Sequence, residues 1–337
     1  MPSLTDPLDT GTLHLKNRIV MPPMAFGLSN ERGEVTKGLS KHYLERCRDL
    51  GLLIVEATNV CPSGHMFKKQ LSIADDSNLA GFEKLVKELH KHETTVAIQL
   101  VHAGGTAPRE LIGGQPLAPS SVKIPELYEE APKEMGQEDI DGVVRAFIES
   151  AGRARAVGFD AVELHGAHGY LLDEFFSPHT NHREDDYGGS LENRTRISLR
   201  IVEGIKREVG PDFPVLYRLG AEDILPGGLS LSEGTEVAQI LAQHGVDILD
   251  VSGGVGLTLE WLDEQSSLTG VLVPQATAVR AAVDVPVIGV GGVKTAEEAD
   301  AIIRSGSVDL IAVGRAILRD PEWASKAVKN SSPHDIK

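Results

Sequence analysis

The sequence contains only two cysteines, Cys47 and Cys61, in 337 residues. A disulfide framework, an iron-sulfur cluster and a cysteine-based zinc site all require more thiols than this, so all three are disfavoured. Long apolar runs are also absent, because none approaches the ~18 residues that span a bilayer. The N-terminus lacks the basic start and apolar core of a signal peptide. These absences predict a cytoplasmic protein that does not interact with membranes.

Basic residues are scarce relative to acidic ones, since 33 Lys and Arg stand against 49 Asp and Glu, a net charge of -16. Such a charge favours solubility and repels polyanions, so nucleic acid is not an expected partner. The hydrophobic fraction is 41%. A chain of this length can therefore bury one large α/β barrel or two ordinary domains, and length alone does not choose between them.

Short apolar segments alternate with amphipathic ones about eight times along the chain. The apolar segments are rich in Val, Ile and Leu without strict alternation, which is typical of parallel strands covered by helices. Strands are expected at 18–21, 52–56, 96–101, 161–165, 215–219, 247–251, 285–290 and 308–313. Helices are expected at 40–50, 79–92, 140–157, 191–209, 231–244, 275–283, 296–305 and 321–329. Eight such units predict an α/β fold, a single (β/α)8 TIM-barrel domain over residues 1–337.

Three βα connections, 102–136, 166–190 and 253–273, are longer than a barrel needs, and extended loops of this kind usually shape a pocket or an interface. The reactive residues of TIM barrels lie after the strands. The candidate positions are therefore 22–25, 57, 99, 165–170, 218, 252–254, 289–292 and 314–315.

The segment 160–194 concentrates ionisable side chains at the end of the fourth expected strand. His165 is the residue at which that strand leaves the core, and His168 and Tyr170 follow within five positions. Three hydrogen-bonding groups spaced across a glycine-containing turn could converge on one ligand atom. From this histidine pair alone, residues that cap the strand or hold a structural metal are an equally good interpretation.

Glycines follow the seventh and eighth expected strands, in IGVGGV at 288–293 and in AVGR at 312–315. Backbone N–H groups beside such glycines can close on a phosphate, and Arg315 adds a charge-assisted contact. The alternative is that the glycines only form tight turns and that Arg315 is a surface cation. A phosphate bound here could belong to a sugar, a metabolite or a flavin mononucleotide.

Two polar side chains stand at the ends of other strands, Gln99 after the third and Arg218 after the fifth. A flavin ring would use both, because the amide matches a heterocyclic edge and the guanidinium stabilises negative charge at the N1/O2 end on reduction. The structural alternatives are that Gln99 bonds neighbouring backbone and that Arg218 pairs with Glu163, Glu56 or Asp223.

Several motifs occur together in this chain: NRIVMPPM at 17–24, EA at 56–57, IQLVHAG at 98–104, LAPS at 117–120, HGAHGYLLDEFFSP at 165–178, NHREDDYGGSLENRTR at 181–196, Arg218, and VGR at 313–315. With these motifs nearly the whole chain resembles the Old Yellow Enzyme family of FMN-dependent NAD(P)H oxidoreductases, or ene-reductases. The run from 165 to 196 is the most specific part of the resemblance. The closest likeness is to the thermophilic-like bacterial branch.

The resemblance implies FMN as the cofactor and NADH or NADPH as the reductant. It also implies roles for particular residues. The expected FMN contacts are Pro22, Pro23, Met24, Ala25 and Ala57 beside the ring, Gln99 and Arg218 at its pyrimidine edge, and Gly291, Gly292, Gly314 and Arg315 at the phosphate. His165 and His168 would hold the substrate carbonyl oxygen, Tyr170 would be the proton donor, and no residue is assigned to a metal.

The implied reaction is the reduction of activated C=C bonds in α,β-unsaturated carbonyl compounds, with hydride from N5 of FMN and a proton from Tyr170. The implied partner is a small enone, and a homo-oligomer, a dimer or a tetramer, is compatible with the resemblance. Two alternatives are a flavin-free, phosphate-binding barrel isomerase or lyase with His165 or Glu163 as base, and a flavin-binding protein without catalysis.

The sequence departs from the resembled branch at two positions. The branch usually has Cys where this chain has Ala25, and Tyr where it has Gly27. The cysteine modulates the flavin potential and the tyrosine helps to hold the substrate oxygen. With both side chains absent, we expect a roomier cavity above the flavin with fewer hydrogen-bond donors.

Overall fold

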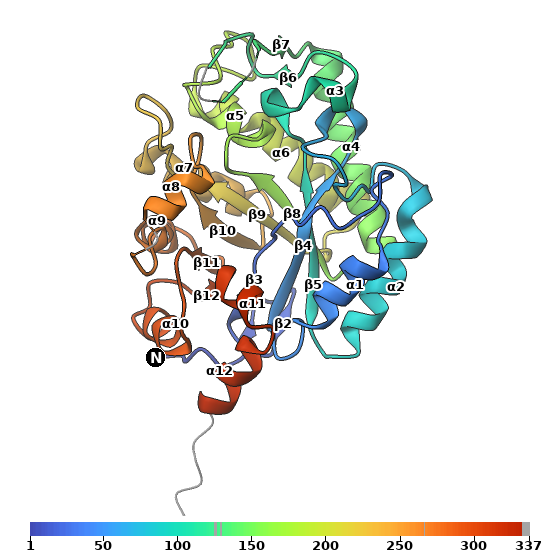
Figure 1. Cartoon of the computed structure of the whole chain (residues 1–337). Helices are drawn as coiled ribbons and strands as arrows, with labels where there is room; N and C mark the ends of the chain where they lie inside the picture. The colour runs from blue at the N-terminus through green and yellow to red at the C-terminus, as the bar shows by residue number, and fades with distance from the viewer. Residues whose placement is uncertain (125–126, 129, 266, 332–337) are drawn as a thin grey trace, which may run out of the picture.

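The computed structural model describes residues 1–124, 127–128, 130–265 and 267–331 (Figure 1). Eight strands of this part of the chain form a closed barrel in the order β10-β11-β12-β3-β4-β5-β8-β9, and every neighbouring pair is parallel. The barrel strands are β3 (Ile19–Met21), β4 (Leu52–Asn59), β5 (Thr95–Val101), β8 (Ala161–Gly166), β9 (Val215–Gly220), β10 (Ile248–Ser252), β11 (Val287–Val290) and β12 (Leu310–Ala312). Their order around the barrel is their order in the sequence, so the predicted TIM barrel is confirmed.

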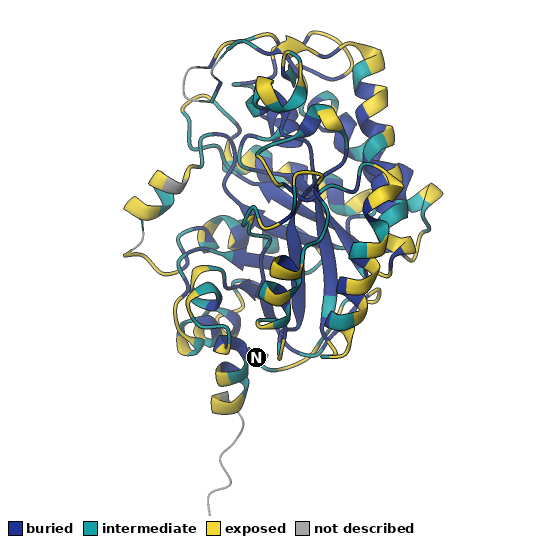
Figure 2. Ribbon diagram, turned by 45° about the vertical axis from the view of Figure 1, so that its right-hand side comes forward, coloured by how far each residue is buried: buried dark blue, intermediate teal, exposed yellow. Residues whose placement is uncertain are grey.

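Helices surround the barrel and turn their exposed faces outward, while the strands in the centre are buried (Figure 2). Those that alternate with the strands are α1 (Lys37–Leu44), α2 (Leu79–His90), α4 (Gln137–Ala156), α6 (Leu191–Glu208), α7 (Leu231–Gln243), α9 (Val273–Arg280), α10 (Ala296–Arg304) and α12 (Trp323–Ser331). No helix within the described ranges is long and apolar enough to cross a bilayer.

Side-chain caps fix where several of these helices begin. Ser230 with Glu233 and Thr295 with Glu298 form capping boxes at the starts of α7 and α10, which satisfy backbone N–H groups that a first turn leaves free. One expected helix, 40–50, was wrong at its end, because α1 ends at Leu44. The chain then turns, and Asp49 adopts a φ of 61° that a right-handed helix cannot contain.

The three long connections carry additional short elements. They are α3 (Arg109–Ile112), β6 (Leu117–Ala118), β7 (Lys133–Glu134), α5 (Leu171–Phe176) and α8 (Leu259–Glu264), while α11 (Arg315–Arg319) follows β12. In Figure 1, α3, α5, β6 and β7 gather at the top of the molecule, beyond one end of the barrel. These loops therefore enlarge one end of the barrel. Residues of 166–190 and 253–273 line the cavity described below, as expected, whereas none of 102–136 does.

The barrel interior is apolar at one end and polar at the other. At the amino ends of the strands an apolar cluster fills the lumen, and an N-terminal hairpin of β1 (Leu8–Asp9) and β2 (His14–Leu15) contributes the fully buried Leu15 to it. Toward the carboxyl ends, neighbouring strands pair Gln99 with Glu163, His165 with Arg218, and Arg218 with Asp250. Polar chemistry is thus confined to the end where TIM-barrel sites form.

Candidate active site

The carboxyl ends of the strands open into a cavity of about 980 Å³. Every residue that the sequence analysis assigned to a cofactor or to catalysis lines this cavity. They are Pro22, Pro23, Met24, Ala25, Ala57, Gln99, His165, His168, Tyr170, Arg218, Gly291, Gly292, Gly314 and Arg315. The structure brings these residues together from seven separate strand ends or loops, while their individual roles remain predictions.

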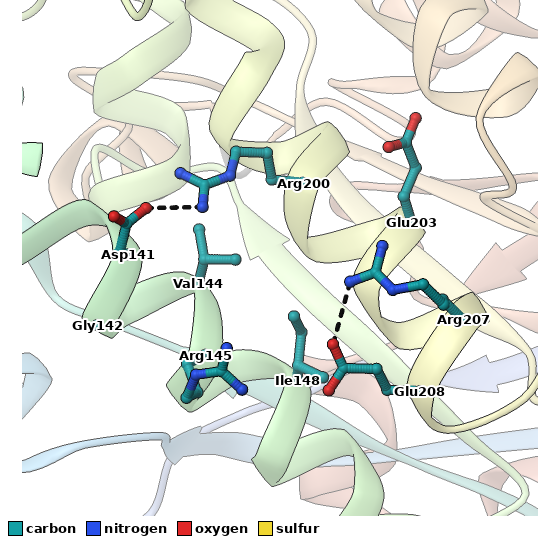
Figure 3. Close-up of a pocket in the computed structure, with 9 residues that line it drawn as sticks. All are labelled: Asp141, Gly142, Val144, Arg145, Ile148, Arg200, Glu203, Arg207 and Glu208. Atoms are coloured by element: carbon teal, nitrogen blue, oxygen red, sulfur yellow. Dashed lines mark hydrogen bonds and ion pairs between the residues drawn. The ribbon is translucent and has the colours of Figure 1, made fainter. Parts of the chain in front are cut away.

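A second cavity, of about 510 Å³, lies outside the barrel between α4 and α6 (Figure 3). Its lining is largely charged, and two of its arginines are already neutralised within it. Arg200 pairs with Asp141 at 2.7 Å and Arg207 with Glu208 at 3.0 Å. None of the residues selected from the sequence lies there, so the barrel cavity is the candidate active site.

The two histidines and Tyr170 form one aromatic group in the barrel cavity. The ring centroid of His165 lies 5.0 Å from that of His168 and 4.9 Å from that of Tyr170. His165 projects from β8, whereas His168 has a φ of 64°, a left-handed conformation that few non-glycine residues adopt. This conformation lets the loop after β8 fold back, so that both rings border the same space.

Both imidazoles are neutral near pH 7. Burial lowers the pKa of His165 and of His168 well below the ordinary value, and the positive charge of Arg218 lowers it further. A neutral ring offers one N–H donor and one acceptor. Nδ1 of His165 is buried without a hydrogen-bond partner in the described part of the chain, whereas Nε2 of His168 lies 2.8 Å from Oγ of Ser252.

The Tyr170 hydroxyl makes no hydrogen bond to any residue that the structure describes. Burial raises the pKa of this phenol, although Arg218 opposes the shift, so the hydroxyl stays protonated at neutral pH. A packing tyrosine would normally bond its hydroxyl to a nearby group. Tyr170 instead presents to the cavity a proton that no group in the described ranges accepts.

Gln99 and Arg218 border the cavity, and each also lies beside a carboxylate of the barrel. Nε2 of Gln99 donates to Oε1 of Glu163 at 2.9 Å, a side-chain partner rather than the backbone partner considered as an alternative. Nε of Arg218 lies 3.6 Å from Oδ2 of Asp250, too far for a hydrogen bond. That buried Nε therefore has no hydrogen-bond partner among the described residues.

Asp250 was not identified from the sequence. It is fully buried beside Arg218, and burial raises the pKa of its carboxyl while Arg218 opposes that shift. Burial also raises the pKa of Glu163 well above its ordinary value, with a further contribution from Asp250. The sequence signal that could have identified it is a charged residue inside the apolar run of the sixth strand, two positions before Ser252.

Glycines shape the far end of the cavity. Gly291 and Gly292 have φ values of 122° and 68°, and a Cβ on Gly292 would lie 2.3 Å from the carbonyl oxygen of Leu268. A side chain is therefore excluded there, and the backbone itself borders the cavity. At Gly314 a Cβ would lie 3.1 Å from the sulfur of Met24, so this backbone also approaches closely.

Arg315 follows these glycines at the start of α11 but has a protein partner that the sequence did not reveal. Its Nη1 lies 3.1 Å from Oδ1 of Asp263, which α8 brings over from the loop after β10. The Arg315 side chain is 42% exposed. Arg315 is thus a surface cation paired with Asp263, and both residues line the cavity.

The residues present fit a flavin mononucleotide. The cavity volume lies at the upper end of the range for small-molecule sites, ~300 to 1,000 Å³. Arg218 brings a guanidinium cation to the cavity wall, and the backbones of Gly291, Gly292 and Gly314 border the same cavity, where N–H groups could hold a phosphate. Fold and site together define a TIM-barrel flavoprotein.

Comparison with known proteins identifies the family. Residues 3–333 match the NADH:flavin oxidoreductase / NADH oxidase family. The chain is 41% identical over 331 residues to an NADH oxidase of Thermoanaerobacter brockii, a match that covers 97% of this chain and half of that protein. It is 39% identical over 317 residues to an NADPH dehydrogenase of Bacillus licheniformis, covering 94% of this chain and 91% of that protein.

A solved Old Yellow Enzyme homologue from Zymomonas mobilis has a TM-score of 0.83 and 25% identity, covering 98% of this chain and 93% of that one. The protein therefore belongs to the NADH:flavin oxidoreductase / NADH oxidase family, and it is an FMN-dependent NAD(P)H oxidoreductase of the Old Yellow Enzyme type. The predicted family, cofactor and enzyme class are confirmed. The flavin-free isomerase or lyase and the flavin-binding protein without catalysis were wrong alternatives.

Replacing Arg218 by alanine should yield largely colourless protein, or a bound flavin that is harder to reduce. The variant removes the positive charge expected at the flavin edge and leaves Asp250 and Glu163 buried without their cation. Absorbance of the purified protein and redox titration measure the two effects. Arg218→Lys is the matched variant, because it keeps the positive charge and loses the planar pair of guanidinium N–H donors. Full flavin occupancy with an unchanged potential in Arg218→Ala would remove Arg218 from the flavin site.

Proposed function

We propose that this enzyme reduces the activated C=C bond of α,β-unsaturated carbonyl compounds, with His165 and His168 binding the carbonyl oxygen and Tyr170 supplying the proton. The observation that carries the proposal is the convergence of these three rings within one cavity, with centroids 4.9 to 6.4 Å apart. The small enone is the proposed partner of the site, and the assembly into a dimer or a tetramer stays a prediction.

The protonation states of the three groups match this reaction. When bound, FMN supplies the hydride that is added to the β-carbon. Negative charge then develops on the carbonyl oxygen, where the N–H groups of His165 and His168 are most stabilising. Tyr170 gives its proton to the α-carbon, and a hydroxyl that is protonated at neutral pH and has no acceptor among the described residues suits that role.

We also propose roles for the cavity residues toward the cofactor. Gln99 and Arg218 bind the pyrimidine edge, and the backbones of Gly291, Gly292, Gly314 and Arg315 hold the phosphate. The ring is bordered by Pro22, Pro23, Met24, Ala25 and Ala57. Their common place in one cavity, to which Arg218 brings a positive charge, supports this assignment.

Anaerobic reduction of the holoenzyme by NADPH or NADH, followed by mixing with an acceptor, tests the proposal. Cyclohexenone and bulkier ring enones should reoxidise the flavin and yield the saturated ketone, whereas cyclohexanone, which lacks the C=C bond, should not. Product analysis by gas chromatography identifies the reduced bond. Failure of every enone in the panel to reoxidise the reduced enzyme would overturn the proposed function.

The cavity wall near the expected substrate is apolar. Phe26, Met66, Leu257 and Leu262 line the cavity, as Ala25 does, whereas Gly27 is not among the lining residues. Phe26 is thus a cavity residue of this loop that was not selected from the sequence, and its ring packs against His42 with centroids 4.0 Å apart. The small Ala25 and the apolar wall support a preference for bulky ring enones.

Gly27→Tyr should tighten the binding of small cyclic enones by up to about tenfold, the value of one neutral hydrogen bond. Gly27 has a φ of 61°, so the substitution should also cost roughly 1 to 2 kcal/mol of stability. A Cβ there would meet no atom closer than the carbonyl oxygen of Lys68 at 3.9 Å, so space is available. Gly27→Phe is the control with the same strain and no hydroxyl. Equal KM values for the two variants would contradict the prediction.

A further inference from the structure

Ser252, the last residue of β10, has no role in the reaction described above. We propose that Ser252 is a positioning residue whose hydroxyl donates a hydrogen bond to Nε2 of His168 and thereby keeps the ring proton on Nδ1, the nitrogen left to bind the substrate oxygen. This inference rests on the proposed function, because it concerns how the neutral His168 becomes a donor to a carbonyl.

The contact is short, buried and exclusive. Oγ of Ser252 lies 2.8 Å from Nε2 of His168, and Ser252 is only 1% exposed. No other residue that the structure describes makes a hydrogen bond to this hydroxyl. The next residue on the same strand end, Gly253, accepts a bond from the backbone N–H of His168 at 3.2 Å. The end of β10 therefore holds both the backbone and the ring of His168.

The hydrogen bond from Ser252 matters because the backbone conformation of His168 is unfavourable without supporting contacts. A φ of 64° costs a non-glycine residue roughly 1 to 2 kcal/mol and persists only where the surroundings determine it. The bonds to Ser252 and Gly253 are such surroundings. They fix which nitrogen of His168 points into the wall of the barrel and which remains for the cavity.

A neutral imidazole has one donor nitrogen and one acceptor nitrogen, so the partner of one nitrogen determines the role of the other. If Nε2 of His168 carried the proton, Nδ1 would be a bare acceptor and would repel a carbonyl oxygen. A serine hydroxyl can donate instead, and then the proton sits on Nδ1 and the ring becomes a donor to the ligand. Metal-binding histidines have their tautomer fixed in the same way by a partner of the other nitrogen.

His165 needs no such partner. Its Nδ1 is buried and has no hydrogen-bond partner within the described ranges, so a proton there would gain nothing. A proton on Nε2 can reach a ligand in the cavity that His165 lines. The two histidines would thus bind one oxygen through different nitrogens, Nε2 of His165 and Nδ1 of His168, and only the second depends on Ser252.

Nitrogen-15 NMR of the FMN-loaded enzyme, labelled on histidine, reads the tautomer directly. The His168 signals are identified by their loss in His168→Ala. We expect wild-type enzyme to carry the proton on Nδ1, and Ser252→Ala to move population to the Nε2-protonated ring. A wild-type His168 with its proton on Nε2, or a Ser252→Ala enzyme with an unchanged tautomer, would overturn the proposal.

Binding of p-hydroxybenzaldehyde to the oxidised holoenzyme, followed by flavin absorbance, supplies an independent measurement. Ser252→Ala should bind this phenol about tenfold more weakly, and Ser252→Thr, which keeps the hydroxyl, should recover most of the loss. The matched control is Ser198→Ala, because Ser198 is fully buried and its Oγ also makes one 2.8 Å bond, to Tyr217 outside the cavity. It should leave phenol binding unchanged.

The variants also separate failure of this inference from failure of the proposed function. Loss of phenol binding in His168→Ala but not in Ser252→Ala would refute the role of Ser252 alone. Unchanged binding in His168→Ala would refute the proposed function of the histidine pair, and the role of Ser252 with it. Equal weakening by Ser252→Ala and by Ser198→Ala would mean that the serine acts only through stability.

Discussion

Tyr170→Phe is expected to slow alkene reduction by about 10² to 10⁴, the usual contribution of a general acid, while reduction of the flavin by NAD(P)H proceeds at its normal rate. The substitution keeps the ring and its contact with His165 and removes only the hydroxyl. That hydroxyl has no hydrogen-bond partner in the described structure, so its loss breaks no internal bond. The effect should therefore fall on proton delivery.

Anaerobic stopped-flow measurement separates the two half-reactions. Tyr217→Phe is the matched control, since it also removes a buried tyrosine hydroxyl. That hydroxyl lies 2.8 Å from Oγ of Ser198, and neither residue lines the cavity. It should change neither half-reaction, apart from any loss of stability. Equal slowing of both half-reactions in Tyr170→Phe would show that Tyr170 shapes the site without donating the proton.

His165→Ala is expected to raise the barrier to alkene reduction by about 2 to 4 kcal/mol, the value of one donor aimed at developing negative charge in a closed site. This corresponds to roughly 30-fold to 1,000-fold in rate. His168→Ala should have an effect of the same order. Because both rings would bind one oxygen, the losses in the double variant should not add.

Single-turnover reduction of an enone by the pre-reduced enzyme measures this loss. His165→Asn, which retains an N–H donor, should recover part of the rate, and this would distinguish donation from packing. Metal analysis checks the structural-metal interpretation of the histidine pair. No group of three or more potential ligands occurs among the residues described in the structure. A stoichiometric metal lost on His165→Ala would replace the present assignment.

The barrel could be read from the sequence because its signals are local. Strand and helix positions follow from apolar periodicity and from caps such as Ser230 and Thr295, which lie within a few residues of what they determine. The errors are also local. Residues 45–50 continue the apolar pattern of α1, yet Asp49 adopts a left-handed conformation that periodicity does not encode.

Which residues share the site could also be predicted from the sequence. In a parallel barrel all strands end at the same rim, so residues that follow strands must share one cavity, however far apart they lie in the chain. This is why Ala57, Gln99, Arg218 and Gly314 could be assigned to one site before their positions were known. The chemical type of the site then followed from the motif at 165–196 and from family membership.

The partners of the site residues required the tertiary structure. His168 and Ser252 are separated by 84 residues, and Arg315 and Asp263 by 52. Whether two such side chains touch depends on barrel register, loop conformation and rotamer, none of which leaves a pattern in a single sequence. The residue types and their places on strand ends were thus set by the sequence. Which nitrogen of His168 is engaged, and which carboxylate lies beside Arg218, were decided only by packing, because these contacts form when the barrel closes.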